Sequence, residues 1–433
     1  MKDPVAKYLR NRAERGGRPV TVGEVEGLAQ VVVIPILAES AELEATLASL
    51  AANTLRDLQR TLIVCVVNNR SPGLVDEDVL ADNRATLEFL KGLIQRPDGH
   101  SLSNLRLVCM DASSPGCELG DKEGVGTARK LGLDWALAVL RRAGNTEGVM
   151  VCLDADTRVE PNYLAAIGRH FGGGSGWGAV IDFAHRFDGP ETQQAAIVAY
   201  ELFLRYHVLG LRYARSPYAF HTIGSTIACT MEAYVAAGGM KRRQAGEDFY
   251  FLQDLAKTGQ VDRIAETTVH PSSRASWRVP FGTGKRVERF MQGNHEEYRV
   301  YHPDSYDILR AWLETVRSHP EADAEYLFSE ARGIAAELEN FLRKQKFETI
   351  WPKLQANTRD SEMLLRQFDR WFDGFTTLKL VHHLRDSGLA EQNTFDALAA
   401  LMWRHGGHTI EKGQLRADLE AQKSVLALVR KLD

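Results

Sequence analysis

The 433-residue chain is predicted to adopt an α/β fold, a sheet flanked by helices, followed by a region made of helices alone. Two observations predict this. Over residues 30–290, short apolar runs of strand length alternate with longer stretches of helical periodicity, which is the pattern of right-handed parallel crossover units. From about residue 300 the strand signals vanish, and helical periodicity with mixed charge continues to the C-terminus.

Composition limits the classes of function. Apolar residues make up 44% of the chain and charged residues 25%, which is typical of a soluble globular protein. The formal net charge of −4 provides no basic field for nucleic acid or anionic lipid, so we expect no nucleic-acid partner. No apolar run has the length of a membrane-spanning helix, the N-terminus has no signal-peptide core, and the five cysteines are scattered. We therefore expect a cytoplasmic protein with no transmembrane segment, disulfide framework or structural zinc.

The first elements follow one another in the order strand, helix, strand, helix, strand. Residues 1–29 are polar and are expected to form a loose N-terminal arm. A buried strand is expected over Val31–Ile36, followed by a helix that Ser40 can cap. Two more strands are expected over Leu62–Val67 and Leu105–Cys109, so a parallel sheet begins here.

The next apolar run, Val149–Leu153, ends abruptly in Asp154-Ala155-Asp156. Side chains alternate along a strand, so Asp154 and Asp156 point the same way from its carboxyl end, which is the edge where open α/β sheets bind ligands. Two converging carboxylates repel each other unless a cation lies between them. Mg²⁺ and Mn²⁺ take few protein carboxylates and complete their shells with water and phosphate oxygens. The pair therefore indicates a metal–diphosphate site, whereas an isolated Asp-x-Asp is more often two solvated loop residues.

A glycine-rich loop that ends in Gly124-Val125-Gly126 leads into a helix. Such a loop can present backbone N–H groups to phosphate, but Gly-x-Gly alone is a weak signal and this is not a Walker A loop. Arg129 lies in the first turn of the helix, where its charge opposes the helix dipole. Because that position is unfavourable for a purely structural arginine, we expect Arg129 to contact a ligand.

The second half of the sheet region continues the same pattern. Glu247 and Asp248 begin a helix that stops at Gly259, a place where acidic residues are also ordinary caps. The remaining elements expected here are strands over Gly178–Phe183, Thr222–Thr230 and Thr267–Val269 and a long amphipathic helix over Glu191–Arg212.

Beyond the strand that ends at His270, the chain is basic and carries glycines at 282 and 284. This composition suits a loop that closes over an anion, and a solvated loop explains it equally well. The cations that are candidate diphosphate or acidic-acceptor contacts are Arg274, Arg278, Lys285 and Arg286.

We therefore expect three parts: an N-terminal arm over 1–29, a sheet domain over 30–300 and a helical domain over 301–433. The histidine pairs of the helical domain have no acidic or cysteine partners near them in the sequence, so they are expected to be structural. The helical domain itself would cover the core, shape an acceptor site or form a homodimer.

Taken together, these motifs resemble the family 2 glycosyltransferases of the GT-A fold, over about residues 30–290. The resemblance depends on Pro35 and Glu39 in and after the opening strand, on Asp154-Ala155-Asp156, and on Gly246-Glu247-Asp248 at a helix start. The helix opening Gly-Thr-Ala-Arg-Lys and the loop Ser-Arg-Ala-Ser-Trp-Arg-Val-Pro-Phe-Gly-Thr-Gly are similar to those of a soluble bacterial subgroup. Ordered motifs at these spacings are more specific than any one alone, so they favour a metal–diphosphate site over solvated aspartates.

The resemblance implies a GT-A-type, Rossmann-like mixed sheet and a nucleotide-sugar-dependent hexosyltransferase that uses Mn²⁺ or Mg²⁺. It also implies a role for each matching residue. Among the cations named above, Arg274, Arg278 and Lys285 are expected to help bind the donor. The implied roles are nucleoside contacts for Pro35, Glu39 and Asn68, donor binding for Arg129, metal or ribose binding for Asp154, direct metal ligation for Asp156, a third metal or diphosphate ligand for His270, and catalysis for Asp248 as the base with Glu247 beside it.

Two departures from the family pattern limit this reading. Asn68-Asn69 stands where the family usually has an acidic pair, so the donor is expected to be a UDP- or GDP-sugar without a choice between the bases. The Gln-x-x-Arg-Trp motif of membrane synthases is absent from the sequence, which argues against a processive polymerase. The acceptor is not identified.

The expected mechanism is inverting, with a metal on Asp156 that neutralises the leaving diphosphate and Asp248 that takes the proton of an acceptor hydroxyl. A helix N-terminus would lower the pKa of Asp248, whereas burial would raise it. Three alternatives stay open: a retaining enzyme of the glucosyl-3-phosphoglycerate or mannosylglycerate synthase type, a nucleotidyltransferase, and a non-catalytic sugar-nucleotide-binding or scaffolding protein. A nucleotidyltransferase normally has a glycine-rich basic loop after its first strand, and none follows Ile36 here.

Overall fold

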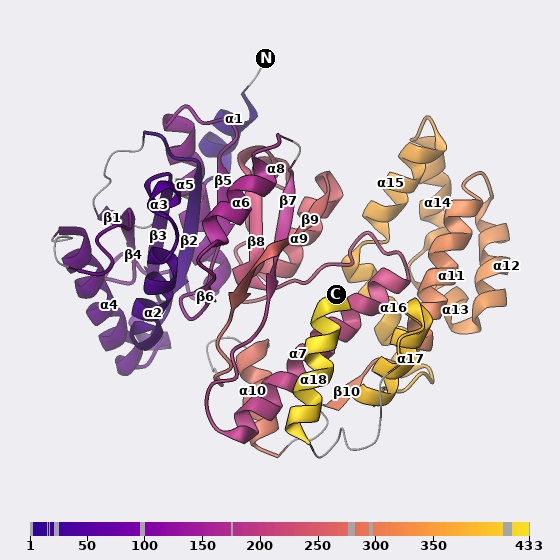
Figure 1. Ribbon diagram of the computed structural model, residues 1–433. Helices are drawn as coiled ribbons and strands as arrows, with labels where there is room; N and C mark the ends of the chain where they lie inside the picture. Colours follow the sequence, from indigo (N-terminus) through magenta and orange to yellow (C-terminus); the bar gives the residue numbers. More distant parts are fainter. Residues whose placement is uncertain are drawn as a thin grey trace. The chain divides into compact units, whose positions relative to one another are not determined.

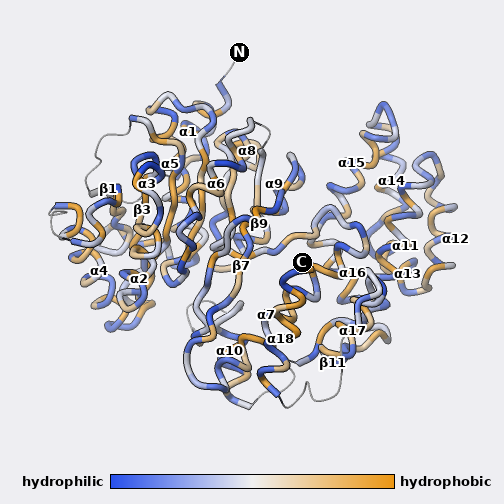
Figure 2. The backbone as a smooth tube through the Cα atoms, viewed as in Figure 1, coloured by the Kyte–Doolittle hydropathy of each residue, from blue (hydrophilic) through white to orange (hydrophobic). Residues whose placement is uncertain are grey.

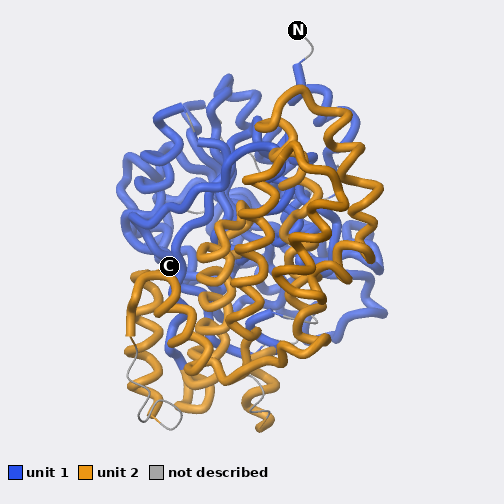
Figure 3. Tube along the Cα trace, turned by 90° about the vertical axis from the view of Figure 1, so that its right-hand side faces the viewer, with its two compact units in different colours: residues 1–188, 222–285 blue, residues 189–221, 286–433 orange. Residues whose placement is uncertain are grey.

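The computed structural model describes residues 3–14, 16, 18–20, 26–95, 100–174, 176–275, 282–293, 298–409 and 418–432. The chain divides into two compact units (Figure 3). Unit 1 consists of residues 1–188 and 222–285, and unit 2 consists of residues 189–221 and 286–433.

Unit 1 is built on a mixed sheet of nine strands in the order β1-β4-β3-β2-β5-β8-β7-β9-β6 (Figure 1). Strands β2 to β5 are parallel to their neighbours among themselves, whereas β8 is antiparallel to both β5 and β7. This mixed α/β sheet confirms the predicted fold class. The strands are β1 (Arg18–Val20), β2 (Gln30–Ile36), β3 (Thr61–Asn68), β4 (Leu107–Ala112), β5 (Val149–Cys152), β6 (Arg158–Val159), β7 (Gly178–Phe183), β8 (Ile227–Thr230) and β9 (Val261–His270).

The centre of the sheet is buried on both faces. Every residue of β2 and of β3 is buried, and these two strands are mostly apolar (Figure 2). Near-continuous runs of valine, isoleucine and leucine are typical of parallel strands that helices cover on both sides. Pro35 lies beyond the last β2–β5 pair, Val33 with Cys152, so its missing N–H interrupts no bond to β5.

Helices cover this sheet, and α5 makes the closest approach. The glycine at 132 faces Val33 of β2, and a Cβ at that position would overlap the Val33 side chain. The helices of unit 1 are α1 (Pro4–Asn11), α2 (Ser40–Ala51), α3 (Leu55–Gln59), α4 (Glu77–Gln95), α5 (Val125–Arg142), α6 (Tyr163–Phe171), α8 (Met231–Ala236) and α9 (Glu247–Thr258), with α10 (Thr283–Met291) at the boundary between the units.

The expected loose arm over residues 1–29 is in part packed against unit 1. Tyr8 of α1 is buried, and its hydroxyl donates to Asp134 at 2.8 Å and accepts from Lys130 Nζ at 2.8 Å. Strand β1 pairs antiparallel with β4. The polar composition misled the prediction because one tyrosine and a short run of backbone hydrogen bonds supply the anchoring, and neither gives a hydrophobic pattern.

Unit 2 is helical, apart from a two-stranded sheet of β10 (Arg299–Val300) and β11 (Gln392–Asn393). The long helix α7 (Glu191–Tyr213) belongs to this unit rather than to the sheet unit, because its buried face packs on α11, α17 and α18. The expected domain boundaries at 300 and 301 do not separate α7 in this way. The other helices are α11 (Asp304–Ser318), α12 (Ala324–Ile334), α13 (Ala336–Lys344), α14 (Phe347–Ala356), α15 (Ser361–Trp371), α16 (Gly374–Asp386), α17 (Thr394–Gly406) and α18 (Leu419–Leu432).

The core of unit 2 is aromatic. Trp312, Phe347 and Phe368 are fully buried, with the rings of Trp312 and Phe347 5.4 Å apart in an edge-to-face arrangement. The adjacent histidines of α16 serve this unit, since His382 shares a hydrogen bond with Tyr301 and His383 with a backbone carbonyl. In the described part of the chain, no helix combines the length and apolarity needed to cross a membrane.

Candidate active site at the edge of the sheet

Strand β5 ends in a fixed turn that carries the acid pair. The Thr157 N–H donates to the Asp154 carbonyl at 3.1 Å, and the Thr46 hydroxyl of α2 donates to the Ala155 carbonyl at 2.8 Å. These bonds hold the backbone, while the side chains of Asp154 and Asp156 stay 32% and 25% exposed. Both carboxylates therefore remain accessible at the carboxyl end of the strand, the edge where α/β sheets bind ligands.

Arg129 of α5 connects Asp154 to the start of another helix. Its side chain is only 5% exposed, and its two terminal nitrogens bind the carboxylates of Asp154 and Glu247. Burial by itself would lower the pKa of Arg129, but the charges of Asp154 and of neighbouring groups such as Asp248, with the hydrogen bond to Asp154, together outweigh it and the pKa is raised. The residue expected to contact the donor thus has its guanidinium between two carboxylates of the protein.

The glycine-rich start of α5 serves packing between two segments of the chain. The Gly126 N–H donates to the Arg243 carbonyl at 3.1 Å, and a Cβ on Gly126 would lie 2.6 Å from the Lys241 carbonyl oxygen. A Cβ on Gly124 would lie 2.9 Å from Cα of Gln244. These glycines allow the loop before α9 to lie directly on the start of α5. The N–H of Gly126, a candidate for phosphate, is used inside the protein.

That loop delivers the predicted base. Gly246 caps α9 with φ of 72°, a conformation that glycine adopts without strain, and Glu247 behind it is 2% exposed. One Asp248 oxygen accepts from the Phe249 N–H at 2.7 Å. Burial raises the pKa of Asp248 and Arg129 lowers it, with a net shift upward. Burial therefore outweighs both the neighbouring positive charge and the backbone hydrogen bonds at the helix start, which lower this pKa.

A second arginine joins the other acids. Arg274, in the segment after β9, binds the carboxylate of Glu39 and lies 3.2 Å from Asp156 Oδ2. Glu39 lies three residues after β2 and directly before α2, which begins at Ser40, so Ser40 is the first residue of the helix and not its cap; the Glu39 side chain is 10% exposed and makes no capping hydrogen bond. Burial would lower the pKa of Arg274, but Glu39 and Asp156 together raise it. Three residues predicted for nucleoside, metal and diphosphate binding thus form one cluster.

His270 has a different environment. Its Nε2 lies 2.8 Å from a Glu160 carboxylate oxygen, and its Nδ1 lies 3.1 Å from the Ala184 carbonyl oxygen. Within the residues that the structure describes, no group of three histidine, cysteine or acidic side chains is placed to hold a metal ion. The structure therefore does not bring His270 together with Asp154 and Asp156 in such a group.

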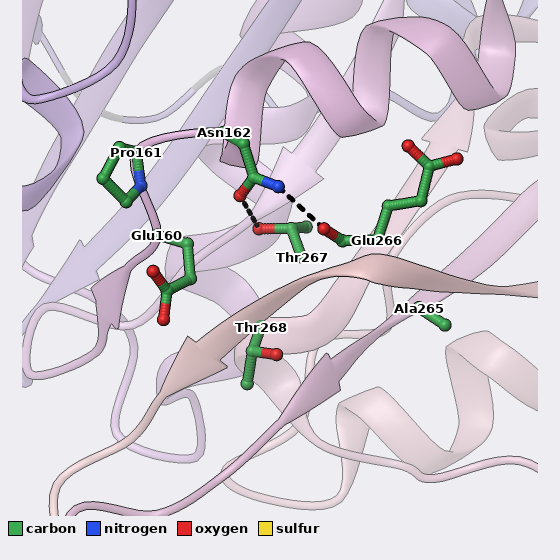
Figure 4. A pocket seen from close by; sticks show the side chains of 7 residues that line it. All are labelled: Glu160, Pro161, Asn162, Ala265, Glu266, Thr267 and Thr268. Atoms are coloured by element: carbon green, nitrogen blue, oxygen red, sulfur yellow. Dashed lines mark hydrogen bonds between the residues drawn. The ribbon is translucent and has the colours of Figure 1, made fainter. Parts of the chain in front are cut away.

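A shallow pocket of about 360 Å³ lies beside Glu160 (Figure 4). Its walls are polar and bonded to one another: Asn162 donates to the Glu266 carbonyl at 2.7 Å and accepts from the Thr267 hydroxyl at 2.9 Å. None of the predicted site residues lines this pocket, although Glu160 in its lining is bonded to His270. Its lining residues are Glu160, Pro161, Asn162, Ala265, Glu266, Thr267 and Thr268.

Asn68 fastens the carboxyl ends of the central strands. It is 4% exposed, and its amide donates to the Ile36 carbonyl at 2.9 Å. Asn83 of α4 donates to the Asn68 carbonyl at 3.0 Å and accepts from the Ala38 N–H at 3.0 Å. The amide predicted to lie beside the nucleoside is thus engaged in holding β3 to β2. Pro35 lies inside β2 and is buried.

The remaining predicted cations lie after β9. Arg278 falls outside the described residues. Lys285 is partly exposed in the first turn of α10 rather than in a loop, because the helix already begins at Thr283.

One ion pair near the candidate site, between Arg186 and Glu42, was not predicted from the sequence. Arg186, three residues beyond β7, binds Glu42 of α2 at 3.0 Å and Asp188 at 2.7 Å. Glu42 lies one helical turn after Glu39, and this acidic spacing at a helix start was the available signal. Arg186 is 144 residues from Glu42, so the sequence gives no indication of this pair.

The residues present can hold a hard divalent cation only if water and phosphate oxygens complete its coordination shell. Asp154 and Asp156 can supply one or two carboxylate ligands, and the described residues add no third in place. Mg²⁺ and Mn²⁺ are bound in this way in phosphate-processing sites, where water and substrate phosphates complete the shell. The donor set therefore suits a metal that arrives with a diphosphate better than a metal held by protein ligands alone.

No family model matches the chain, and no curated protein matches it significantly. Among solved structures, it is similar to S. aureus TarS 1–349 in complex with UDP-GlcNAc, at 13% identity and a TM-score of 0.38 over 83% of this chain and 92% of that one. It is similar to the mannosyltransferase PcManGT from Pyrobaculum calidifontis in complex with GDP-Man and Mn²⁺, at 13% identity and a TM-score of 0.38 over 89% and 94%. GalNAc-T7 with UDP, GalNAc and Mn²⁺ matches at 16% identity and a TM-score of 0.35 over 71% and 54%. Because these scores are low, the function proposed below depends on the residues of the site.

Proposed function

We propose that the chain is a metal-dependent glycosyltransferase that moves a sugar from a nucleotide-diphosphate sugar to an acceptor hydroxyl. One observation supports this best. Acidic side chains from the ends of β2 and β5 and from the start of α9 gather at one edge of the sheet, joined by two arginines. They are Glu39, Asp154, Asp156, Glu247 and Asp248, with Arg129 and Arg274.

The donor would bind at the Asp154–Asp156 turn. A bound Mg²⁺ or Mn²⁺ would neutralise the charge that develops on the leaving nucleoside diphosphate. Asp156 and Asp154 would hold that ion with their accessible carboxylates. Arg274 lies next to Asp156, so its guanidinium is placed to exchange a carboxylate partner for diphosphate oxygens, which it can bind in a bidentate manner. The donor is a UDP- or GDP-sugar under this proposal.

Asp248 would serve as the base of an inverting transfer. A base must be ionised and must also hold a proton well enough to remove it from a hydroxyl, so a raised pKa suits the task. Burial supplies the rise in the pKa of Asp248, while Arg129 keeps the carboxylate form accessible. A retaining enzyme of the glucosyl-3-phosphoglycerate or mannosylglycerate synthase type would need no such base.

The test is a thermal-shift titration with UDP, GDP and their sugars, with and without Mn²⁺, followed by a donor-turnover assay. A ligand that binds only the native state raises the melting temperature by mass action. We expect one nucleotide to give a metal-dependent shift that Asp156→Ala abolishes and that Asp78→Ala, an exposed acid of α4, leaves unchanged. Binding without turnover would favour a sugar-nucleotide-binding or scaffolding protein. No shift with any nucleotide in folded protein would overturn the proposal.

A further inference from the structure

Arg129 is closed off from any ligand by the residues that bind it. Its side chain is 5% exposed, and its partner Glu247 is 2% exposed at the side chain. Its Nε is buried and has no hydrogen-bond partner among the described residues. Only Asp154, at the outer end of the bridge, is accessible. The guanidinium therefore has its two strong contacts within the chain and presents no free face to a donor.

The absence of a side chain at Gly224 leaves space for the Arg129 guanidinium. A Cβ on Gly224, just before β8, would overlap the terminal nitrogen of Arg129 that binds Asp154. The backbone of Gly224 is not among those with positive φ, so the need for glycine here is one of space and not of conformation. The end of β5, the start of α5, the start of α9 and Gly224, three residues before β8, thus converge on one guanidinium.

Two contacts tie the start of α5 to the start of α9. The Gly126 N–H donates to the Arg243 carbonyl in the loop before α9, and Arg129 binds Glu247, the first residue of α9. Asp248 is the next residue along the chain, so the orientation of Glu247 sets the place of the proposed base. The same guanidinium fixes Asp154, which the proposed function assigns to the donor side.

We propose that Arg129 is a positioning residue of the transfer step, which holds the donor-side carboxylate Asp154 and the base-bearing start of α9 at a fixed separation without touching the substrate. This inference depends on the proposed function. An arginine is required because its planar fork binds two carboxylates at once, whereas lysine carries one compact charge. Without the fork, two nearby carboxylates repel each other and lose their common orientation.

The first experiment compares Arg129→Lys with Arg142→Lys, an exposed arginine at the other end of α5. We expect Arg129→Lys to lower kcat by about 10- to 100-fold, the usual loss when a residue behind a ligand is changed. The Kd of the nucleotide with Mn²⁺, measured by calorimetry, should change by less than about 3-fold, because the donor makes no contact with Arg129. Arg142→Lys should match the wild type in both quantities.

The second experiment keeps every charge and moves only the guanidinium. Gly224→Ala places a methyl group against Arg129, and we expect the same drop in kcat with nearly unchanged nucleotide binding. Gly168→Ala is its control, because an added Cβ on α6 meets no atom within 4 Å. Circular dichroism and the melting temperature establish that each variant is folded before kcat is compared.

Two results would overturn the inference while leaving the proposed function intact. A Kd weakened 10-fold or more by Arg129→Lys, with kcat retained, would make Arg129 a donor contact. A lower melting temperature with unchanged kcat per folded molecule would make it a stabilising residue only. If the wild type itself neither binds nor turns over any nucleotide sugar, both proposals fail, and that outcome is visible before any variant is made.

Discussion

At the edge of the sheet, acidic side chains of the candidate site are paired with arginines from distant parts of the chain. Asp154 binds Arg129 of α5, and Asp156 shares Arg274 with Glu39. Converging carboxylates need positive charge nearby, and here the protein supplies it from its own side chains. A metal–diphosphate ligand would bring both a cation and an anion. The carboxylates could then bind the metal and the arginine could bind the diphosphate, with little change in the net charge of the site.

Arg274→Ala tests this exchange, because it should strengthen the binding of Mn²⁺ and weaken the binding of the nucleotide. Without the arginine, the Asp156 carboxylate loses a screening charge, so Mn²⁺ alone should bind more tightly. The nucleotide diphosphate loses a cationic contact and should bind more weakly at saturating Mn²⁺. A unit charge near a surface contributes roughly 1 kcal/mol or more, so each change should be about 3- to 10-fold. Calorimetric titrations with metal and then nucleotide measure both constants.

Arg169→Ala is the matched control, because Arg169 forms an exposed ion pair with Glu266 outside the site. It should leave both binding constants unchanged. If Arg274→Ala shifted metal and nucleotide binding in the same direction, the exchange of partners would be excluded.

Asp248→Asn tests the base. The variant keeps the shape of the side chain but cannot accept a proton, so transfer should fall by about 100-fold or more, the low end of general-base contributions. Nucleotide and Mn²⁺ should still bind. Asp254→Asn on the same helix, where Asp254 pairs with Lys241, is the control and should retain activity. Full activity of Asp248→Asn would favour the retaining alternative.

The same residue predicts a pH dependence. The pKa of Asp248 is raised because burial disfavours its charged form more than Arg129 favours it. The base works when ionised, so kcat/KM should rise with pH through a value above the ordinary aspartate pKa of 3.8. Rates measured with the nucleotide sugar across the acidic range check this. An acidic limb at or below that ordinary value would contradict the assignment.

Among the elements, α5 matters most for the site, because it packs on the central strands and also carries Arg129. Gly132 is the point of closest approach to Val33. Gly132→Ala should force the helix outward and destabilise the protein by about 1–3 kcal/mol, as added methyl groups in packed cores do. Gly92→Ala on α4 meets no atom within 4 Å and should be neutral or slightly stabilising. Urea unfolding of both variants gives the comparison.

The sequence predicts those helices and strands that depend on local patterns, and it does not predict those that depend on pairing with distant residues. The strand that ends in Asp154-Ala155-Asp156 was predictable because an apolar run and its polar end are local features. The start of α9 at Glu247 was predictable from its acids and glycine for the same reason. The short strands β1 and β6 were not, since two or three residues give no periodicity and only their partners define them.

Pairings across the chain explain the remaining differences. Arg129 was identified as unusual from its position against the helix dipole, but Glu247 lies 118 residues away and could not be identified as its partner. The packing role of Gly124 and Gly126 at the start of α5 is not visible in the sequence, because the Lys241–Gln244 backbone that they accommodate is equally remote. His270 was placed correctly at the end of a strand, while its partner Glu160 was not recognised.

In the whole molecule, the chain passes between the two units three times, and each unit has a core of its own. The helical unit contains a buried carboxylate, Glu201 of α7, which is 0% exposed and binds Arg205 and Arg430. Arg430 lies on α18, so this pair fastens the last helix to a helix from the middle of the chain. Unit 2 is thus closed by residues that are 229 positions apart.

Separate cores predict separate responses to heat. Two transitions are expected in calorimetry, since chains with several domains commonly depart from two-state unfolding. Arg430→Met should remove a charged hydrogen bond from a buried carboxylate and cost about 1–3 kcal/mol in unit 2. Its transition should fall by roughly 3–10 °C at this size. Arg366→Met, which breaks only an exposed pair with Glu362, should leave it unchanged.

Binding of the nucleotide with Mn²⁺ identifies which thermal transition belongs to unit 1. Asp154, Asp156 and Arg274, which the proposed function assigns to the nucleotide and Mn²⁺, lie in unit 1, so the ligand should raise one transition and leave the one lowered by Arg430→Met in place. Such a pattern would mean that the donor site forms without a stabilised helical unit. A single transition that both the ligand and Arg430→Met displace would instead show that the two cores unfold as one cooperative structure.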